Sequence, residues 1–219
     1  MRDLDDENTP LRPQFDLLLS EGVGPFLGSM GFTQHGTKFV RYRGTIYDVI
    51  GFQNDWHNDV YSWHGFFVNV GVGSREVDEV WPGPCPQPPI GFLFDRRWES
   101  VVPDLPYEPR FNRNTDMKEF AAALREGLEM VVAVIEGFDC TATLVEYATT
   151  NNLLIAYERT CCYLAAIEDV DALAGYVGVL RDHFGHQERW AIFNREISRV
   201  SGSCTRTLVE RGVLDPVTR

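Results

Sequence analysis

The strongest constraint on the fold is a strict alternation of residue types in the first half of the chain. Four large apolar residues occupy every second position within the segment 61–73: Phe66, Val68, Val70 and Val72. Because successive side chains of a strand point to opposite faces, this pattern predicts a β-strand with one continuous apolar face. The segments 37–43 and 45–54 are also rich in β-branched and aromatic residues, and turn residues separate the three segments. Together they predict an antiparallel meander.

The apolar face of this sheet requires a covering element, and the segment 14–30 supplies a candidate. Its apolar residues recur at helical spacing: Phe15, Leu19, Val23, Phe26, Leu27 and Met30. Pro13 suits the start of a helix, and Gly31 suits its end. Pro25, preceded by two nearby glycines, predicts a kink or a break within the helix, because proline lacks the amide hydrogen. The expected fold class is α+β, with the N-terminal helix packed on an antiparallel sheet of about four or five strands.

Proline marks the connections that follow. Residues 81–89 read WPGPCPQPP, which predicts a stiff, extended loop because proline cannot donate the hydrogen bonds of a sheet. Residues 90–98 predict a further strand that returns to the sheet, and residues 103–114 form another connector with several prolines.

The second half of the chain is predicted to be helical. Asp116 with Glu119 three residues later forms an N-terminal capping pattern, and the helix that follows ends near Gly137. Shorter helices are expected at 151–167, 170–184 and 187–201. We therefore predict an α+β domain over residues 1–113 and a helical C-terminal region over residues 114–219.

The charge balance excludes several classes of partner. The chain has 20 Lys and Arg against 32 Asp and Glu, for a formal net charge of −12. Such a surface repels nucleic-acid phosphates and anionic membranes, so neither is expected as a partner. No apolar run approaches a bilayer span, and the start of the chain, residues 1–9, is acidic where a signal peptide would be basic. Five cysteines without paired spacing favour reduced thiols and a cytoplasmic location.

Several short patterns in the first half resemble a known family. Gly31-Phe32, Phe39-x-Arg41, the segment 49–53 (VIGFQ) and the segment 67–72 (FVNVGV) occur in the order and spacing of the bacterial domain-of-unknown-function family 4304. A later family element resembles Arg96-Arg97-Trp98. The resemblance covers roughly the first half of the chain and implies an α+β fold and bacterial cytosolic residence. No activity is established for that family, so it provides no catalytic residues.

This chain departs from the family pattern directly after the VIGFQ segment. The family continues with serine and a short polar hairpin, whereas residues 54–64 here are longer and rich in Asp, Trp and His. We interpret this segment as a partner-binding hairpin, because aromatic side chains beside carboxylates combine large contact area with negative charge. The residues expected to contact the partner are Asp55, Trp56, Asp59, Tyr61 and Trp63.

Two other interpretations of the same hairpin remain open. His57 and His64 with Asp55 and Asp59 are weak candidates for a metal site, because imidazole and carboxylate groups bind divalent cations, although their spacing matches no ligand motif. The segment is also compatible with an ordinary polar hairpin tip, since turns favour Asn and Asp for backbone reasons alone.

Other clusters have simpler structural explanations. Cys161-Cys162 falls in a predicted helix, where cysteine commonly packs as a small apolar residue. His183 and His186 lie at a predicted helix end, where an imidazole interacts favourably with the helix dipole. The arginines at 96–97 are expected to pair with neighbouring carboxylates. The sequence contains no G-x-S-x-G pattern, and we assign no catalytic residue and no cofactor.

Three functional hypotheses follow from these observations. The first is a non-catalytic acidic binding protein, such as an immunity or antitoxin-like protein that neutralises a basic protein partner, possibly a toxin. The second is a small metal-assisted hydrolase that uses Asp55, His57, Asp59 and His64. The third is a structural adaptor whose helical half, from Asp116 onward, presents a groove to another protein, which exposed apolar surface on those helices would favour.

Overall fold

The computed structural model describes residues 10–86, 89, 91–151 and 154–216. Outside the described residues lie the acidic start at 1–9, residues 87 and 88 of the proline-rich connection, residue 90 of the strand expected at 90–98, and residues 152 and 153 of the helix expected at 151–167. The chain divides into two compact units. The first, here called the sheet unit, comprises residues 1–72 and 95–138, and the second, the helical unit, comprises residues 73–94 and 139–219. The predicted division at residue 113 stays a prediction, and helix α5 belongs to the sheet unit.

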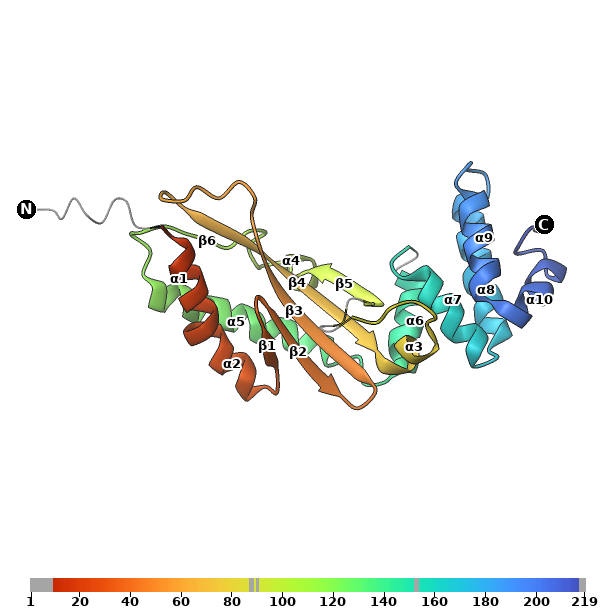
Figure 1. Cartoon of the computed structure of the whole chain (residues 1–219), viewed down its shortest axis with the longest axis horizontal. Helices are drawn as coiled ribbons and strands as arrows, with labels where there is room; N and C mark the ends of the chain where they lie inside the picture. The colour runs from red at the N-terminus through yellow and green to blue at the C-terminus, as the bar shows by residue number, and fades with distance from the viewer. Residues whose placement is uncertain (1–9, 87–88, 90, 152–153, 217–219) are drawn as a thin grey trace, which may run out of the picture. The chain divides into compact units, whose positions relative to one another are not determined.

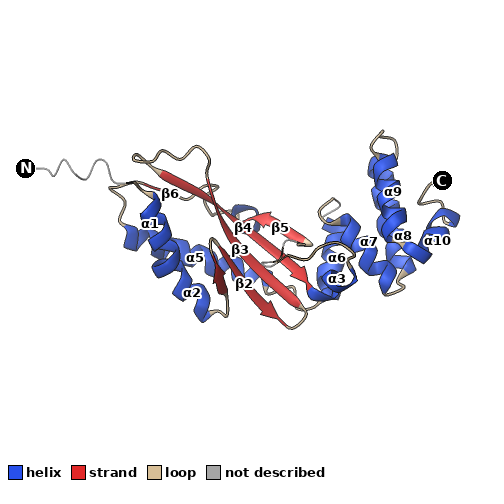
Figure 2. Cartoon of the chain, viewed as in Figure 1, coloured by secondary structure: helices blue, strands red, loops and turns tan. Residues whose placement is uncertain are grey.

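The α+β fold class is confirmed. The strands are β1 (Thr33–His35), β2 (Lys38–Arg43), β3 (Ile46–Asn54), β4 (His64–Ser74), β5 (Phe94–Arg97) and β6 (Arg110–Phe111). They form one sheet in the order β1-β2-β3-β4-β5, and β6 pairs with β4. The alternation of residues 66–72 does produce a strand, and the four residues of its apolar row are completely buried. Figure 2 shows these strands gathered in one layer.

The apolar row of β4 is covered by helices that come before the sheet in the sequence and by helices that follow β4. They are α1 (Arg12–Leu17), the π-helix η2 (Leu18–Val23), α2 (Gly24–Ser29), the short α4 (Trp98–Val101) and α5 (Met117–Ile135). Phe66 of β4 contacts Phe15 of α1, with ring centroids 5.1 Å apart, and Phe120 of α5 at 6.3 Å. The expected N-terminal helix and the long helix that follows Asp116 therefore lie on the same face of the sheet (Figure 1).

The N-terminal helix is interrupted where the sequence predicts a break. Pro25 has no amide hydrogen, and the backbone N–H of Gly24 donates to the carbonyl of Leu19, five residues earlier. A turn closed over five residues is a π-turn, which explains the π-helical segment between α1 and α2. Phe15, Leu19, Val23 and Leu27 all remain buried across this interruption.

The helical unit is almost entirely helix and loop (Figure 2). Its helices are α3 (Arg75–Val80), α6 (Thr141–Asn151), α7 (Tyr157–Ala166), α8 (Val170–Phe184), α9 (Trp190–Val200), the 3-10 helix η3 (Gly202–Cys204) and α10 (Thr205–Glu210). The prediction for α8 agrees with the structure at both ends, and Asp169 caps it by accepting from the N–H of Ala172. Of the helix expected at 151–167, α7 covers Tyr157–Ala166, while Asn151 is the last residue of α6. Helices α3, α6 and α10 were not predicted. None of the helices in the described ranges is long and apolar enough to cross a membrane.

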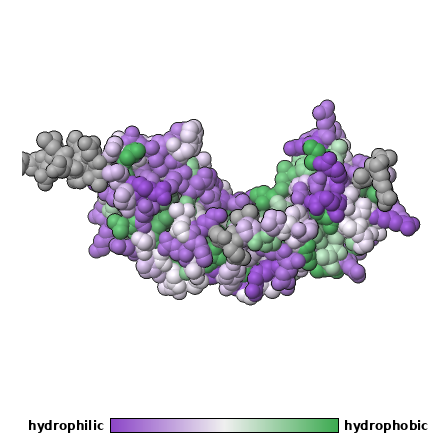
Figure 3. Space-filling view, in the orientation of Figure 1, coloured by the Kyte–Doolittle hydropathy of each residue, from purple (hydrophilic) through white to green (hydrophobic). Residues whose placement is uncertain are grey.

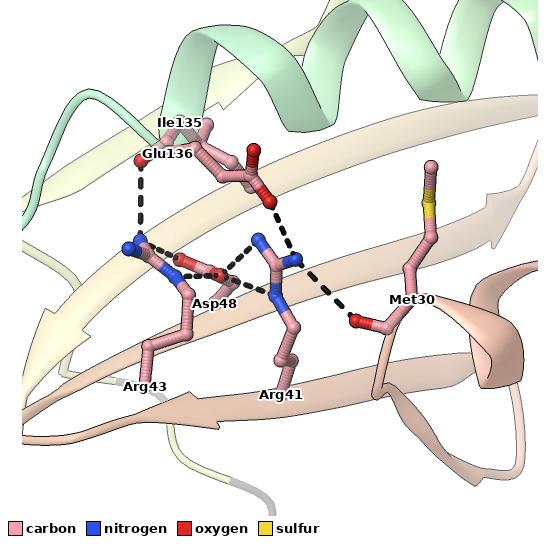
Figure 4. Close-up of polar contacts among 6 residues, drawn as sticks. All are labelled: Met30, Arg41, Arg43, Asp48, Ile135 and Glu136. Atoms are coloured by element: carbon pink, nitrogen blue, oxygen red, sulfur yellow. Dashed lines mark hydrogen bonds and ion pairs between the residues drawn. The ribbon is translucent and has the colours of Figure 1, made fainter.

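A buried ion-pair cluster joins the sheet to both covering helices. Asp48 of β3 is completely buried and lies opposite Arg41 of β2 in the strand register. Its Oδ2 atom lies 2.7 Å from NH2 of Arg41 and 2.7 Å from Nε of Arg43, and its Oδ1 accepts from NH2 of Arg43 at 2.8 Å (Figure 4). The second carboxylate of the cluster, Glu136, lies 2.8 Å from NH1 of Arg41.

The same two guanidinium groups reach the C-terminal ends of helices. Arg41 donates to the carbonyl of Met30 after α2 at 3.4 Å, and Arg43 donates to the carbonyl of Ile135 at the end of α5 at 3.2 Å (Figure 4). The carbonyl of Ile135 also accepts from the backbone N–H of Phe138. Cations are favoured near the last carbonyls of a helix, at the negative end of the helix dipole. The cluster therefore fixes where both helices end above the sheet.

We predict that Asp48→Asn lowers the free energy of unfolding by about 3–5 kcal/mol, because it leaves buried guanidinium groups without their shared carboxylate. Urea denaturation measures the change. The matched control is Asp16→Asn, which removes the exposed pair between Arg12 and Asp16 and should cost less than about 1 kcal/mol. Equal, small losses in the two variants would contradict this role for Asp48.

Candidate interaction site at the β3–β4 loop

The segment singled out by the sequence forms the loop between β3 and β4, residues 55–63, here called the β3–β4 loop. Three of the five predicted contact residues are exposed. Trp56 is 85% exposed, Tyr61 is 46% exposed, and Asp59 is also exposed. Val60, which is not among the predicted contact residues, is 57% exposed and adds to the apolar surface.

The other two predicted contact residues are largely covered. Asp55 is only 8% exposed, and Trp63 is half-buried beneath the guanidinium of Arg110, which lies 3.9 Å from the centroid of its ring. This contact could not be predicted from local patterns, because Arg110 is in the proline-containing connector and reaches the loop through the pairing of β6 with β4.

The loop is held in shape by its own polar side chains. Oδ1 of Asp55 accepts from the backbone N–H of His57 at 3.0 Å and lies 3.1 Å from Nδ1 of the same residue. Oδ1 of Asp59 accepts from the backbone N–H groups of Tyr61 and Ser62 at 2.9 and 2.7 Å. Such Asx turns let a side chain replace the missing backbone partner in a tight turn. Both carboxylates therefore stabilise the conformation of the loop and also give it negative charge.

These hydrogen bonds also keep the two carboxylates ionised. The backbone N–H of His57 lowers the pKa of Asp55, and burial opposes the effect. The backbone N–H groups of Tyr61 and Ser62 lower the pKa of Asp59. A hydrogen bond donated to the charged form of a carboxyl group stabilises that form, so both residues carry negative charge at neutral pH.

The base of the loop is anchored to the core through Asn58 and His64. Asn58 Oδ1 accepts from the N–H of Gly65 at 2.6 Å, and Asn58 Nδ2 donates to the Gly65 carbonyl at 2.8 Å. His64 is only 5% exposed, and its ring packs 4.8 Å from Phe15 and 5.4 Å from Phe111. The exposed part of the loop thus stands on a well-packed base.

The two histidines of the loop region have separate partners. His57 lies against Trp56, with ring centroids 3.6 Å apart, and bonds Asp55, whereas Nε2 of His64 lies 3.2 Å from Oδ1 of Asn54. Within the described part of the chain, no group of three or more His, Cys, Asp or Glu side chains is placed to hold a metal ion. The described side chains of the loop therefore form no set of metal ligands that would support the metal hypothesis.

The cysteine, histidine and arginine clusters noted in the sequence make contacts that fit a structural role. Cys161 and Cys162 are both buried in α7, and burial raises the pKa of each thiol, which makes them poor nucleophiles. His183 lies in the last turn of α8, with Nδ1 2.9 Å from the carbonyl of Val179. Arg97 stacks on Phe67 at 4.3 Å from the ring centroid, and Trp98 is buried.

The fold and this site describe an α+β protein with an ordered loop that exposes Trp56, Asp59 and Tyr61. The chain belongs to the family described as "Domain of unknown function (DUF4304)", which matches residues 23–135. No curated protein and no solved structure matches the chain significantly. The family match spans α2 to α5 and includes the β3–β4 loop.

Burial of His64 makes a testable contribution to the pH dependence of stability. Burial lowers the pKa of His64 below its ordinary value of 6.5, so the unfolded chain takes up this proton first as the pH falls. The stabilisation is present above about pH 6.5 and is lost as the pH falls toward the lower pKa of the folded state. We expect His64→Phe, which retains the aromatic packing, to lose less unfolding free energy than the wild type between about pH 7.5 and about pH 5.5.

Denaturant titrations at the two pH values measure this difference. The control is His35→Gln in the exposed strand β1, which should keep the wild-type pH dependence. An identical pH dependence in His64→Phe and the wild type would show that His64 does not contribute.

Proposed function

We propose that this chain is a non-catalytic acidic binding protein, comparable to bacterial immunity proteins and antitoxins, that binds a basic protein partner through the β3–β4 loop. The observation that carries the proposal is Trp56, which is 85% exposed on a loop that is otherwise ordered. Leaving a tryptophan in water is unfavourable, and tryptophan is among the residues that dominate the energy of protein interfaces. Five free thiols in the structure fit a reducing compartment, and we place this function in the cytoplasm.

The order of the loop supports binding. Asp55, Asn58 and Asp59 hold its backbone through hydrogen bonds from residues 57–65, so little conformational entropy is lost when a partner is bound. Trp56, Val60 and Tyr61 then provide an apolar contact surface that does not have to form on association.

Charge supports the choice of a basic partner. The net charge of the chain is −12, and Asp59 is ionised at the exposed end of the loop. Glu119, Glu126 and Glu129 are exposed on α5 of the same unit. A field of one sign accelerates the encounter with a partner of the opposite sign, while the aromatic side chains determine how slowly the complex dissociates.

The metal-assisted alternative requires Asp55, His57, Asp59 and His64 to gather around one ion. In the structure Asp55 bonds His57, Asp59 bonds backbone N–H groups, and His64 lies next to Asn54. This alternative therefore has less support than binding.

One specific observation supports the adaptor alternative. Large apolar side chains are exposed on the helical unit, namely Leu154, Ile167, Val179 and Ile192. On the face drawn in Figure 3, apolar residues gather over the helical unit in the region of α7 to α9. A contact surface there would act in addition to the β3–β4 loop rather than replace it.

We test the proposal by expressing the product of the adjacent gene with and without this chain. The expected result is that this chain relieves growth inhibition by that product and forms a complex with it. Trp56→Ala should weaken the complex by at least about 2 kcal/mol, or roughly 30-fold in Kd, with an unchanged melting temperature. Isothermal titration calorimetry measures the affinity.

The matched control is Tyr42→Ala, which removes an aromatic side chain that is 49% exposed on β2, away from the loop. It should leave the affinity unchanged. If no toxicity is relieved and no complex is isolated, or if both variants bind as the wild type does, the proposal is wrong.

A second prediction concerns the charge of the loop alone. In Asp59→Asn the amide oxygen can still accept from Tyr61 and Ser62, so the loop keeps its shape while the charge is removed. We expect a several-fold slower association at low salt, a smaller difference at high salt, and little change in dissociation. Stopped-flow kinetics at several salt concentrations would show whether the carboxylate steers the encounter.

A further inference from the structure

The sheet unit contains an apolar pocket that the proposed function does not use. It lies between the segment 105–110 and α5, and its volume is about 330 Å³. The apolar part of its lining comes from Trp98, Leu105, Pro106, Pro109, Phe120 and Leu124. An apolar cavity of about 150 Å³ holds benzene, and pockets for small molecules begin at about 300 Å³. This pocket therefore accommodates a compact ligand of one substituted ring or two fused rings.

Contacts within the protein hold the walls of this pocket in place. Nε1 of Trp98 donates to the carbonyl of Pro106 at 2.7 Å, which joins α4 to the segment 105–110. A Cβ atom at Gly127 would lie 2.8 Å from Cζ3 of Trp98 and 2.9 Å from Cδ2 of Leu105, so glycine lets both side chains approach α5 closely. The pocket is therefore largely formed in advance, which reduces the entropic cost of binding.

Polar groups of the lining are engaged within the protein. Besides the indole bond described above, the N–H of Leu105 donates to the carbonyl of Val102 at 3.1 Å, and the carbonyl of Pro109 accepts from the N–H of Phe66 at 3.1 Å. Pro106 and Pro109 have no N–H to donate. Because these groups are already paired, a polar ligand gains no bond from them, whereas it loses its bonds to water on burial.

The two charged residues of the lining are paired with each other. Oε2 of Glu108 accepts from NH2 of Arg110 at 2.8 Å, and the Glu108 carboxyl group also hydrogen-bonds Asp55. Its Oε1 atom lies against Gly65, where a Cβ atom would overlap it. The guanidinium of Arg110 lies over the ring of Trp63. The opposite charges of Glu108 and Arg110 compensate each other, so they favour neither an anionic nor a cationic ligand.

Two aromatic side chains of the lining favour an aromatic ligand over an aliphatic one. Trp98 of α4 and Phe120 of α5 both line the pocket. Phe120 packs edge-on against Phe111, with ring centroids 5.7 Å apart, and is half-buried, so part of its surface stays accessible. Aromatic rings in edge-to-face or offset contact gain free energy beyond the burial of their apolar area.

We propose that this pocket binds a small, neutral aromatic molecule through apolar contact and ring packing rather than through hydrogen bonds or charge. The ring of the ligand lies against Trp98, Phe120 and Leu124. The inference rests on the lining of the pocket, and it does not depend on the proposed function of the β3–β4 loop.

The test compares three probes of matched size: n-propylbenzene, 2-phenylethanol and phenethylamine. They share a phenyl ring and end in a methyl, a hydroxyl and an ammonium group. Binding to the full chain is followed through the indole N–H resonance of Trp98 in an assigned NMR spectrum. We expect n-propylbenzene to shift this resonance and to bind at least about tenfold more tightly than either polar probe. Equal or tighter binding of a polar probe, or no binding of n-propylbenzene, would overturn the proposal.

A matched pair of substitutions locates the site. Ala123→Trp places a large ring at an exposed lining position of α5 and should weaken binding of n-propylbenzene at least about tenfold. Ala133→Trp makes the same change at an exposed position of α5 outside the lining, and it should bind the probe as the wild type does. Unchanged binding in Ala123→Trp, or an equal loss in both variants, would contradict the proposal. The comparison of probes in the wild type decides the matter if Ala123→Trp does not fold.

A last control separates the pocket from the β3–β4 loop. Trp56→Ala removes the exposed ring of the loop and should bind n-propylbenzene as the wild type does, because Trp56 is not part of the lining. A loss of binding in this variant would mean that the probe occupies the loop and not the pocket. A response of the Trp56 indole resonance without one from Trp98 would lead to the same conclusion.

Discussion

The buried carboxylate of Asp48 determines how the sheet unit is assembled. It is completely buried and lies across from Arg41 in the sheet, with Arg43 two residues further along the same strand. Removing a carboxylate from water costs several kcal/mol, and that cost is offset only when its oxygens are fully hydrogen-bonded. The two guanidinium groups supply these bonds and also reach carbonyls at the ends of α2 and α5. Two strands and two helices therefore have to meet at one point.

The β3–β4 loop uses its acidic residues in a different way. In the core, Asp48 joins separate elements, whereas in the loop Asp55 and Asp59 bond N–H groups only two or three residues away. Local bonds of this kind shape a turn without tying it to the rest of the protein. The loop can therefore expose Trp56 and Tyr61 in a defined arrangement, while Asn58 and His64 connect its base to the core.

The elements predicted correctly from the sequence are those defined by local patterns. The alternation of residues 66–72 identified β4, and Asp116 identified the start of α5, because period and capping act over a few residues. The pairing of β6 with β4 was missed, since it depends on residues far apart in the chain. For the same reason the contact of Arg110 with the ring of Trp63 could not be predicted, and the role of Trp63 in binding stays a prediction. The sequence of the segment identified the residues of the loop, whereas tertiary packing determines which of these residues are exposed to solvent.

The π-turn in the N-terminal helix keeps one line of apolar side chains on the buried side of the helix. Phe15, Leu19, Val23 and Leu27 follow each other at intervals of four residues. In a regular α-helix each such interval rotates the side chain by about 40°, so the last residue would point roughly 120° away from the first. A turn closed over five residues rotates less per residue and reverses this drift. The hydrogen bond from the N–H of Gly24 to the carbonyl of Leu19 thus compensates for the four-residue spacing, so that all four side chains stay buried along one side of the helix.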